Sequence, residues 1–289
     1  MPEAGGQITG RSTLTATEVT QVRDLIATCN AVEHLDLKVD IASLGAENGR
    51  ANNIFVAYAG EALAGFCTLD GDTEIELCGG VHPDFRHHGI GSALLSAARE
   101  ECRRRGATKV LLICEDNSRS GQGFVATRGL RREFTELRME LDVSAAGVPA
   151  VTSSLAIRPA TDDDQAAIAH IRALAFASDE VSEQHRIAAD MENGAEHYFI
   201  ALRRDVPIGT LKIFHEPPRA LIYGFAVLPT YQGHGYGREI LHQTIRLLSE
   251  EGWTHIGLEV DSVNARAYNL YESTGFHPIT TYGYFALPL

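Results

Sequence analysis

The sequence predicts a mixed α/β protein that consists of two copies of one domain, each a mostly antiparallel sheet flanked by helices. Three observations predict this fold. An eleven-residue segment recurs at a fixed spacing along the 289-residue chain. Each half contains a run of short apolar segments separated by turn residues, which is typical of an antiparallel meander. In each half a glycine-rich turn then leads into a helix with one apolar face.

The repeat is carried by Val81–Gly91 and Val227–Gly237, which agree at five of eleven positions and lie 146 residues apart. The same offset places Gly129 on Gly275, so the register holds for about fifty residues without a gap. Self-similarity at a fixed offset is the signature of a duplicated unit. We therefore expect one domain, present twice.

A segment of small and polar residues with Gly and Pro separates the two copies, a composition typical of a linker. We expect an N-terminal domain over residues 1–142, a linker over 143–154 and a C-terminal domain over 155–289. Two domains of about 145 residues are each long enough to bury a core.

The elements follow the same order in both copies. In the first copy we expect strands over residues 7–9, 53–58, 64–69, 74–78 and 109–114. In the second copy we expect strands over residues 155–158, 197–202, 208–214, 221–227, 255–260 and 281–287. A helix begins after Thr161 and Asp162, whose side chains favour a helix N-cap. A second helix follows each glycine turn, with its apolar residues spaced to lie on a sheet.

Composition and charge exclude several classes of protein. Apolar residues make up 44% and charged residues 22%, as in an ordinary globular protein. The net charge of −13 argues against a nucleic-acid or anionic-membrane partner. No apolar run is long enough to span a membrane, and the N-terminus lacks a signal-peptide pattern, so we expect a cytoplasmic protein. The five cysteines show no paired spacing and are expected to be reduced thiols.

The glycine turn of the second copy is a candidate anion site. Gly233, Gly235 and Gly237 allow positive φ, so successive backbone N–H groups can converge on one anion at the start of a helix. A tight strand-to-helix turn without a ligand is the alternative. The spacing is neither that of the dinucleotide fingerprint nor that of a Walker A loop.

At these residues the sequence resembles the GCN5-related N-acetyltransferase (GNAT) family, whose Arg/Gln-x-x-Gly-x-Gly/Ala turn holds the pyrophosphate of acetyl-coenzyme A. Arg86–Gly91 and Gln232–Gly237 both match, each after a Val-x-Pro-x-aromatic lead. The resemblance covers nearly the whole chain and implies two tandem GNAT-like domains with acetyl-coenzyme A as cosubstrate. The implied coenzyme-binding residues are Phe225, Ala226, Val227, Gln232, Gly233, His234, Gly235, Tyr236, Gly237, Arg238 and Asn264, and in the first copy Val81, Arg86, His87, His88, Gly89, Ile90 and Gly91.

The resemblance also implies a general acid. Residues 264–276 resemble the family segment in which a tyrosine protonates the coenzyme sulfur, and this tyrosine is Tyr271 here. A packing aromatic on an amphipathic helix is the alternative. The offset places Val125 where Tyr271 stands, and valine cannot donate a proton. We therefore expect the first copy to have lost catalysis.

The general base stays open. Family members often use a carboxylate on the strand before the turn, where the second copy has none. The first copy has Glu74 and Glu76 there, which is the best case for activity in that copy. Glu259 is our candidate, with Asp261, Glu216 and His215 as alternatives on neighbouring strands. The histidines show no metal-ligand spacing, so we expect no metal.

The expected function is transfer of acetyl from acetyl-coenzyme A to an amine of a small molecule or peptide, by a monomer or homodimer. Two alternatives stay open. One is a non-enzymatic sensor or scaffold that binds coenzyme A. The other is acetylation of a thiol precursor, as in mycothiol synthase, a family member with a lapsed first copy.

Overall fold

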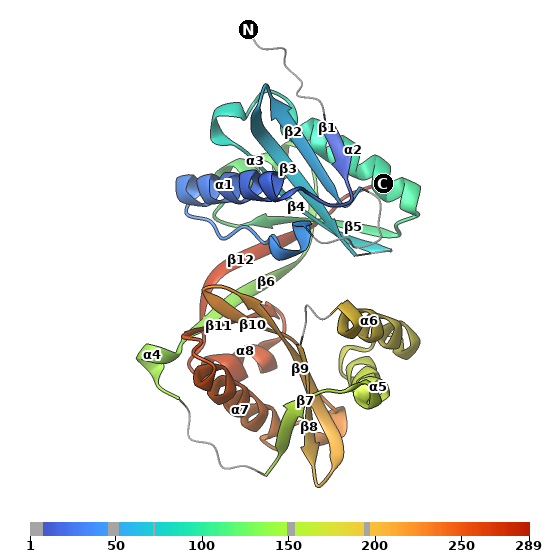
Figure 1. Ribbon diagram of the computed structural model, residues 1–289, viewed down its shortest axis with the longest axis vertical. Helices are drawn as coiled ribbons and strands as arrows, with labels where there is room; N and C mark the ends of the chain where they lie inside the picture. Colours follow the sequence, from blue (N-terminus) through green and yellow to red (C-terminus); the bar gives the residue numbers. More distant parts are fainter. Residues whose placement is uncertain (1–7, 46–51, 72, 149–153, 194–196) are drawn as a thin grey trace. The chain divides into compact units, whose positions relative to one another are not determined.

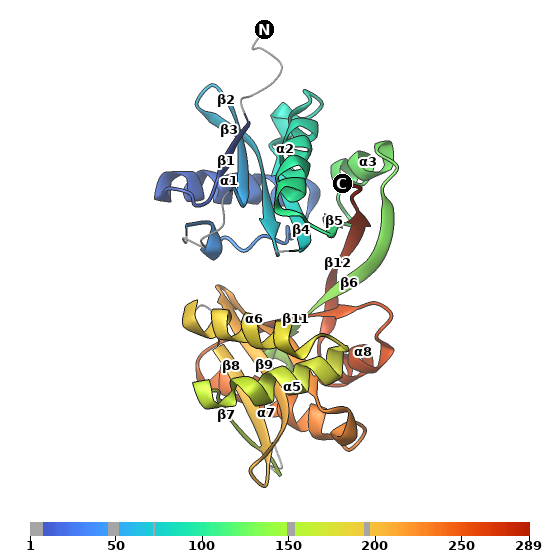
Figure 2. The same cartoon turned by 90° about the vertical axis from the view of Figure 1, so that its right-hand side faces the viewer.

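The computed structural model describes residues 8–45, 52–71, 73–148, 154–193 and 197–289 (Figure 1). The chain forms two compact units. The first comprises Met1–Glu136 and Thr280–Leu289, and the second comprises Leu137–Ile279. In each unit, helices lie on both faces of the paired strands (Figure 2).

The sheet of the first unit has the strand order β1-β2-β3-β4-β5-β12. Its strands are β1 (Ile8–Arg11), β2 (Ile54–Ala59), β3 (Ala62–Asp70), β4 (Glu74–Val81), β5 (Lys109–Glu115) and β12 (His277–Ala286). Neighbouring strands are antiparallel except for β4 and β5, which are parallel. A parallel pair needs a long crossover, and here α2 (Ile90–Arg105) provides it.

The second unit repeats this topology. Its strands are β7 (Ala156–Pro159), β8 (His197–Arg203), β9 (Val206–Glu216), β10 (Arg219–Val227), β11 (His255–Asp261) and β6 (Arg131–Asp142), in that order across the sheet. The parallel pair is β10 and β11, with α7 (Tyr236–Glu250) as the crossover. The predicted class, a mixed and mostly antiparallel sheet flanked by helices in two tandem domains, is confirmed.

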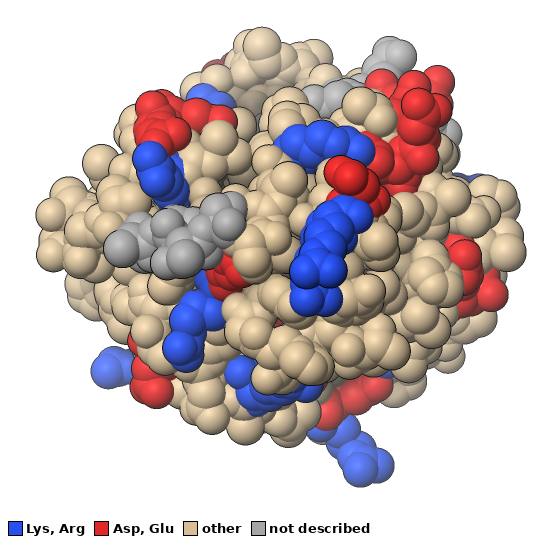
Figure 3. Space-filling view, turned by 90° about the horizontal axis from the view of Figure 1, so that it is seen from below, with Lys and Arg blue, Asp and Glu red and all other residues tan. Residues whose placement is uncertain are grey.

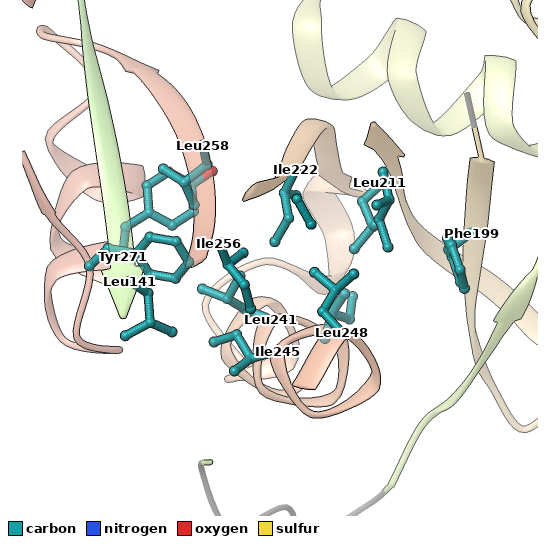
Figure 4. Close-up of a cluster of buried hydrophobic side chains, with 14 of the residues drawn as sticks. Leu141, Phe199, Leu211, Ile222, Leu241, Ile245, Leu248, Ile256, Leu258 and Tyr271 are labelled. Atoms are coloured by element: carbon teal, nitrogen blue, oxygen red, sulfur yellow. The ribbon is translucent and has the colours of Figure 1, made fainter. Parts of the chain in front are cut away.

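Helices cover both faces of each sheet. In the first unit α1 (Ala16–Glu33) lies on one face, and α2 with α3 (Arg119–Thr127) lies on the other. In the second unit α5 (Gln165–Phe176) and α6 (Glu180–Asn193) lie opposite α7 and α8 (Ala265–Glu272). Successive side chains of a strand point to opposite faces of the sheet. Phe199 therefore belongs to the hydrophobic cluster that includes Leu241 and Leu248 of α7 (Figure 4), whereas Ile200 packs with Ile168 of α5.

The last strand of each half crosses the boundary between the compact units: β6 enters the second unit at Leu137, and β12 enters the first unit at Thr280. Tyr284 of β12 pairs with Ile113 of β5 in the first unit, whereas Arg138 of β6 bonds Glu259 of β11 in the second. The 146-residue offset relates these two contacts to each other. The predicted limits 1–142 and 155–289 thus mark the sequence repeats, while the compact units cross them, because a repeat does not specify which sheet a terminal strand joins.

The segment between the repeats is described in part. A four-residue helix, α4 (Val143–Ala146), occupies the start of the predicted linker, and residues 149–153 lie outside the described residues. Thr161 precedes a short 3₁₀ helix, Asp162–Asp164, that leads into α5, and its backbone N–H and hydroxyl donate to Asp164 Oδ2 at 2.8 and 3.0 Å.

The surface carries charges of both signs. Acidic and basic side chains are interspersed on the face shown in Figure 3. Within the described ranges, no helix is long and apolar enough to cross a membrane. The five cysteines are free and buried thiols, as expected.

Candidate active site

The two glycine turns have the same backbone conformation. A short 3₁₀ helix follows β4 or β10, and the turn then reaches Gly89 or Gly235, each with φ of +86°. A Cβ at either glycine would meet no heavy atom within 4 Å, so the space beside the turn is open. Neither α2 nor α7 has a side-chain cap at its start. The first N–H groups of both helices are therefore available to an anion.

The first side chain of each turn ties the turn to the preceding strand. Arg86 Nε donates to the Val81 carbonyl at 3.1 Å, and Gln232 Nε2 donates to the Val227 carbonyl at 2.9 Å. Two polar side chains with different charge thus make the same bond in the two copies. The polar side chain that begins each turn is thus engaged with its own preceding strand.

The remaining predicted turn residues surround the same loop. His88 and His234 are exposed, and each has Nδ1 within 3 Å of a carbonyl two residues earlier, at 2.7 and 2.9 Å. His87 adopts φ of +65°, at the position where the second copy has Gly233. Ile90 is buried, and Tyr236 stacks on His234 with ring centroids 6.0 Å apart. The two further predicted contacts are used locally: Arg238 Nη2 donates to Ser273 Oγ, and Asn264 Oδ1 caps α8 by accepting from Ala267 N–H.

The parallel strands separate just before each turn. Pairing of β4 with β5 extends to Leu77 and Leu112, and pairing of β10 with β11 extends to Ile222 and Leu258. Beyond these pairs the ends of β4 and β10 have no register partner on the parallel strand. An edge of this kind can bond the amides of an extended ligand.

The gap between the strands is open in the first unit. A cavity of about 660 Å³ lies there, between the glycine turn, the ends of β4 and β5, and α3. The residues that define its position are Gly79, Gly80, Val81, Gly89, Glu115 and Phe124. Gly79 is required, because a Cβ there would lie 2.3 Å from the Phe66 carbonyl oxygen.

A carboxylate bonds three residues that line this cavity. Glu33, near the end of α1, pairs with Arg86 at 2.5 Å and accepts from the hydroxyls of Ser118 and Ser120 at 2.9 and 3.2 Å. Burial opposes ionisation of Glu33, but these hydrogen bonds and Arg86 outweigh it and lower its pKa. Sequence reasoning missed Glu33, because it is distant in sequence from all of its partners.

In the second unit, aromatic side chains occupy the positions that correspond to Gly79 and Val125 of the first unit. The ring centroids of Phe225 and Tyr271 are 6.4 Å apart, and Tyr271 is 7% exposed. In Figure 4 the Tyr271 hydroxyl points toward β11 near Leu258, where β10 and β11 part. Burial raises the pKa of this phenol to about 12, so it stays protonated at neutral pH.

Glu259, the candidate base, forms a buried ion pair. Arg138 Nη2 and Nε lie 3.1 and 3.2 Å from Glu259 Oε1, and both side chains are less than one-tenth exposed. The ion pair thus engages the Glu259 carboxylate with a charged partner. The contact joins residues 121 positions apart, so the sequence carried no local signal for it.

Of the alternatives, Glu216 and His215 lie away from the glycine turn, whereas Asp261 lies at the end of β11. Glu216 pairs with Arg219 at 3.5 Å in the β9–β10 hairpin, at the opposite end of β10 from the glycine turn. His215 stacks on Trp253 with ring centroids 4.8 Å apart, beyond the far end of α7. Asp261 accepts from the Val263 N–H at 3.0 Å in the turn after β11. Within the part of the chain that the structure describes, no cluster of three metal-ligating side chains is found.

Two segments of the chain, residues 19–129 and 165–276, match the model of the acetyltransferase (GNAT) family. A mycothiol acetyltransferase of Acidothermus cellulolyticus is 28% identical over 242 residues, which are 74% of this chain and 72% of that protein. A mycothiol acetyltransferase of Streptomyces scabiei is 25% identical over 292 residues, 95% of this chain and 93% of that protein.

Solved structures share the whole architecture. A GCN5-related N-acetyltransferase from Sphaerobacter thermophilus superposes with a TM-score of 0.76 at 17% identity, covering 99% of this chain and 96% of that one. A tandem GNAT protein from the clavulanic acid biosynthesis pathway superposes with a TM-score of 0.74 at 19% identity, covering 97% and 98%. At such identities the likeness establishes the fold.

Proposed function

The chain belongs to the acetyltransferase (GNAT) family and is an acetyl-coenzyme A-dependent acetyltransferase; on that premise we propose that its second unit transfers acetyl to an amine of a small molecule or peptide. The observation that carries this proposal is the place of Tyr271. Its buried phenol points toward β11 near Leu258, at the last register pair between β10 and β11 (Figure 4). The corresponding residue of the first unit is Val125.

In this proposal the coenzyme lies along the end of β10. The N–H groups that begin α7 hold the pyrophosphate, and the backbone of Phe225, Ala226 and Val227, which has no register partner on β11, bonds the pantetheine amides. The amine nitrogen attacks the thioester carbonyl carbon, and the carbon–sulfur bond breaks. The departing thiolate takes a proton from Tyr271, which regains it from solvent, while the amine loses its proton to solvent or a base.

The identity of the base follows less directly. Glu259 remains a candidate, but its carboxylate is already engaged in a buried pair with Arg138. A neutral amine that loses its proton to water needs no carboxylate. We therefore place the proton donor, rather than Glu259, at the centre of the proposal.

The acceptor class is drawn from the relatives. Proteins 25–28% identical over most of the chain carry the name mycothiol acetyltransferase. We propose the amine precursor of mycothiol, or a related thiol-bearing amine, as the first acceptor to test. Other small amines and peptide N-termini form the comparison set.

The first unit is proposed to bind coenzyme without catalysing transfer. It keeps the turn, the unpaired strand end and a cavity of about 660 Å³, a size typical of small-molecule sites. It has no phenol at the position of Val125. Coenzyme bound there without transfer would have a regulatory or bracing role.

The test is a transfer assay with acetyl-coenzyme A and the acceptor set, following release of the coenzyme thiol and the acetylated product by mass spectrometry. Stoichiometric formation of both products with at least one amine is expected. Tight coenzyme binding without transfer to any amine would favour the sensor or scaffold instead.

A further inference from the structure

A buried arginine lies against β10 on the face opposite Tyr271. Arg172 of α5 is 6% exposed, and its Nε donates to Glu183 Oε2 of α6 at 2.7 Å. Burying a charge is costly unless it is paired and hydrogen-bonded. Nothing in the proton-transfer scheme above uses this pair, so its place in the fold needs another explanation.

Two further side chains besides Arg172 donate hydrogen bonds to the Glu183 carboxylate. The exposed Arg186 also bonds Glu183 Oε2, and Ser178 Oγ donates to Oε1 at 2.8 Å. Burial opposes ionisation of Glu183, but the arginines and the serine outweigh it and lower its pKa. The carboxylate therefore serves to hold Arg172 in place, rather than Arg172 serving only to neutralise the carboxylate.

The other end of the guanidinium holds an irregularity in β10. Arg172 Nη1 donates to the Gly224 carbonyl oxygen at 3.3 Å. Gly224 has φ of +55°, and a Cβ there would lie 2.0 Å from Arg172 Nη1. The register of β10 against β9 shifts between Tyr223 and Ala226, which leaves Gly224 and Phe225 outside the regular ladder. Only glycine fits beside the guanidinium, and only glycine adopts this conformation readily.

The direction of the next N–H follows from the planar peptide. The Gly224 carbonyl and the Phe225 N–H belong to one trans peptide and point in opposite directions. Because the carbonyl faces Arg172 on the α5 side, the N–H faces the α7 and α8 side, where the ring of Phe225 lies 6.4 Å from that of Tyr271. This N–H is free of the regular β9 ladder.

We propose that Arg172, held by Glu183, is a positioning residue that fixes the β10 bulge so that the Phe225 N–H meets the thioester carbonyl oxygen. The inference rests on the proposed function of the second unit. An N–H fixed in advance stabilises the oxyanion that forms when the amine attacks. Arginine suits this role because its planar fork bonds Glu183 and Gly224 at once, which the single ammonium of lysine does less well.

Four variants test the role. Arg172→Gln removes the bond to Gly224, and Gly224→Ala displaces the guanidinium from the other side. Arg172→Lys keeps a charge for Glu183 without the fork. Arg186→Gln is the matched control, because it removes the second arginine from Glu183 but does not touch β10. Steady-state kinetics and amide hydrogen exchange of residues 223–227 are measured for each.

Arg172→Gln and Gly224→Ala are expected to lower kcat about 100-fold, with KM for acetyl-coenzyme A changed less than about threefold. Both are expected to speed exchange at residues 223–227, and their double variant is expected to be little worse than either single one. Compared with Arg172→Gln, the Arg172→Lys variant should have a melting temperature closer to that of the wild type, but its kcat should stay low. Arg186→Gln should keep the wild-type kcat.

Equal kcat in all variants, or an equal loss in Arg186→Gln, would overturn the positioning role. So would full rescue of kcat by lysine. Failure of the proposed function is separately visible: Tyr271→Phe and Gly235→Glu would then retain wild-type transfer, whatever the Arg172 variants do.

Discussion

Phe225 and Tyr271 lie with their ring centroids 6.4 Å apart where β10 and β11 separate. The equivalent positions of the first unit hold Gly79 and Val125, and there the separated strands border a cavity of about 660 Å³. One topology thus presents a phenol in one unit and open space in the other. This contrast is the basis for proposing chemistry in the second unit and coenzyme binding alone in the first.

Replacement of Tyr271 by phenylalanine tests the proton donor. The ring and its contacts with Phe225 and Phe276 are retained, while the hydroxyl is lost. We expect kcat to fall about 10²- to 10⁴-fold, the range of general acid catalysis, with KM for acetyl-coenzyme A within about threefold of wild type. Steady-state kinetics at saturating amine measure both constants.

Tyr268→Phe is the matched control for that experiment. Tyr268 lies on the same helix, and its hydroxyl donates to Glu272 at 3.2 Å on the exposed side. This variant is expected to keep kcat within about twofold. An unchanged kcat in Tyr271→Phe would assign Tyr271 to packing alone.

The pH profile gives a second test of the phenol. Burial raises the pKa of Tyr271 to about 12, so it remains protonated, and able to donate, well above neutral pH. We expect kcat to rise as the amine loses its proton and then to stay level up to about pH 10. A descending limb with an apparent pKa below 9 that disappears in Tyr271→Phe would contradict the buried environment of this phenol.

Variants of Arg138 and Glu259 distinguish a structural role of Glu259 from a catalytic one. Glu259→Gln leaves the Arg138 charge buried without its carboxylate, and we expect a loss of about 3–5 kcal/mol in the free energy of unfolding. Urea denaturation measures it. The double variant Arg138→Met with Glu259→Gln should regain much of this stability and keep its activity. Loss of activity in that folded double variant would restore Glu259 as the base.

Acid stability depends in part on Glu101. Hydrogen bonds from Arg104, stronger than the opposing cost of burial, and from Arg105 lower the pKa of Glu101 to about 2. A carboxyl whose folded pKa is depressed stabilises the protein above its unfolded pKa, and this contribution is lost as the pH falls from about 5 toward 2. We expect Glu101→Gln to lower stability at pH 7 by on the order of 2 kcal/mol and to flatten its decline in acid. An unchanged decline between pH 5 and 2 would exclude this pair as a source of acid sensitivity.

Local patterns in the sequence predicted most of the fold. The duplicated turn at Gly89 and Gly235 and the strands before it are encoded within a few residues, and each is found as expected. The exchange of terminal strands was not predictable, because β6 and β12 are compatible with either sheet. It decides which side chain meets Glu259.

Of the candidate site, the sequence predicted the backbone of the glycine turns but not the side-chain contacts around them. Arg138 and Glu259, or Arg172 and Gly224, meet through the tertiary fold, and neither contact has a sequence pattern. The open cavity of the first unit had a signal that went unused: the repeat offset places Gly79 on Phe225, and a glycine opposite a phenylalanine indicates a difference in space between the strands.

The most direct test of the central claim compares Gly89→Glu with Gly235→Glu. Both glycines have φ of +86° and open space around a Cβ, so the added side chains strain the two turns equally, and Gly→Ala at each position controls for that strain. Calorimetric titration of acetyl-coenzyme A and the transfer rate are measured together. We predict two binding sites in the wild type and one in either variant, with transfer abolished by Gly235→Glu and retained in Gly89→Glu. Retained transfer in Gly235→Glu with loss in Gly89→Glu would place the active centre in the first unit and contradict the account.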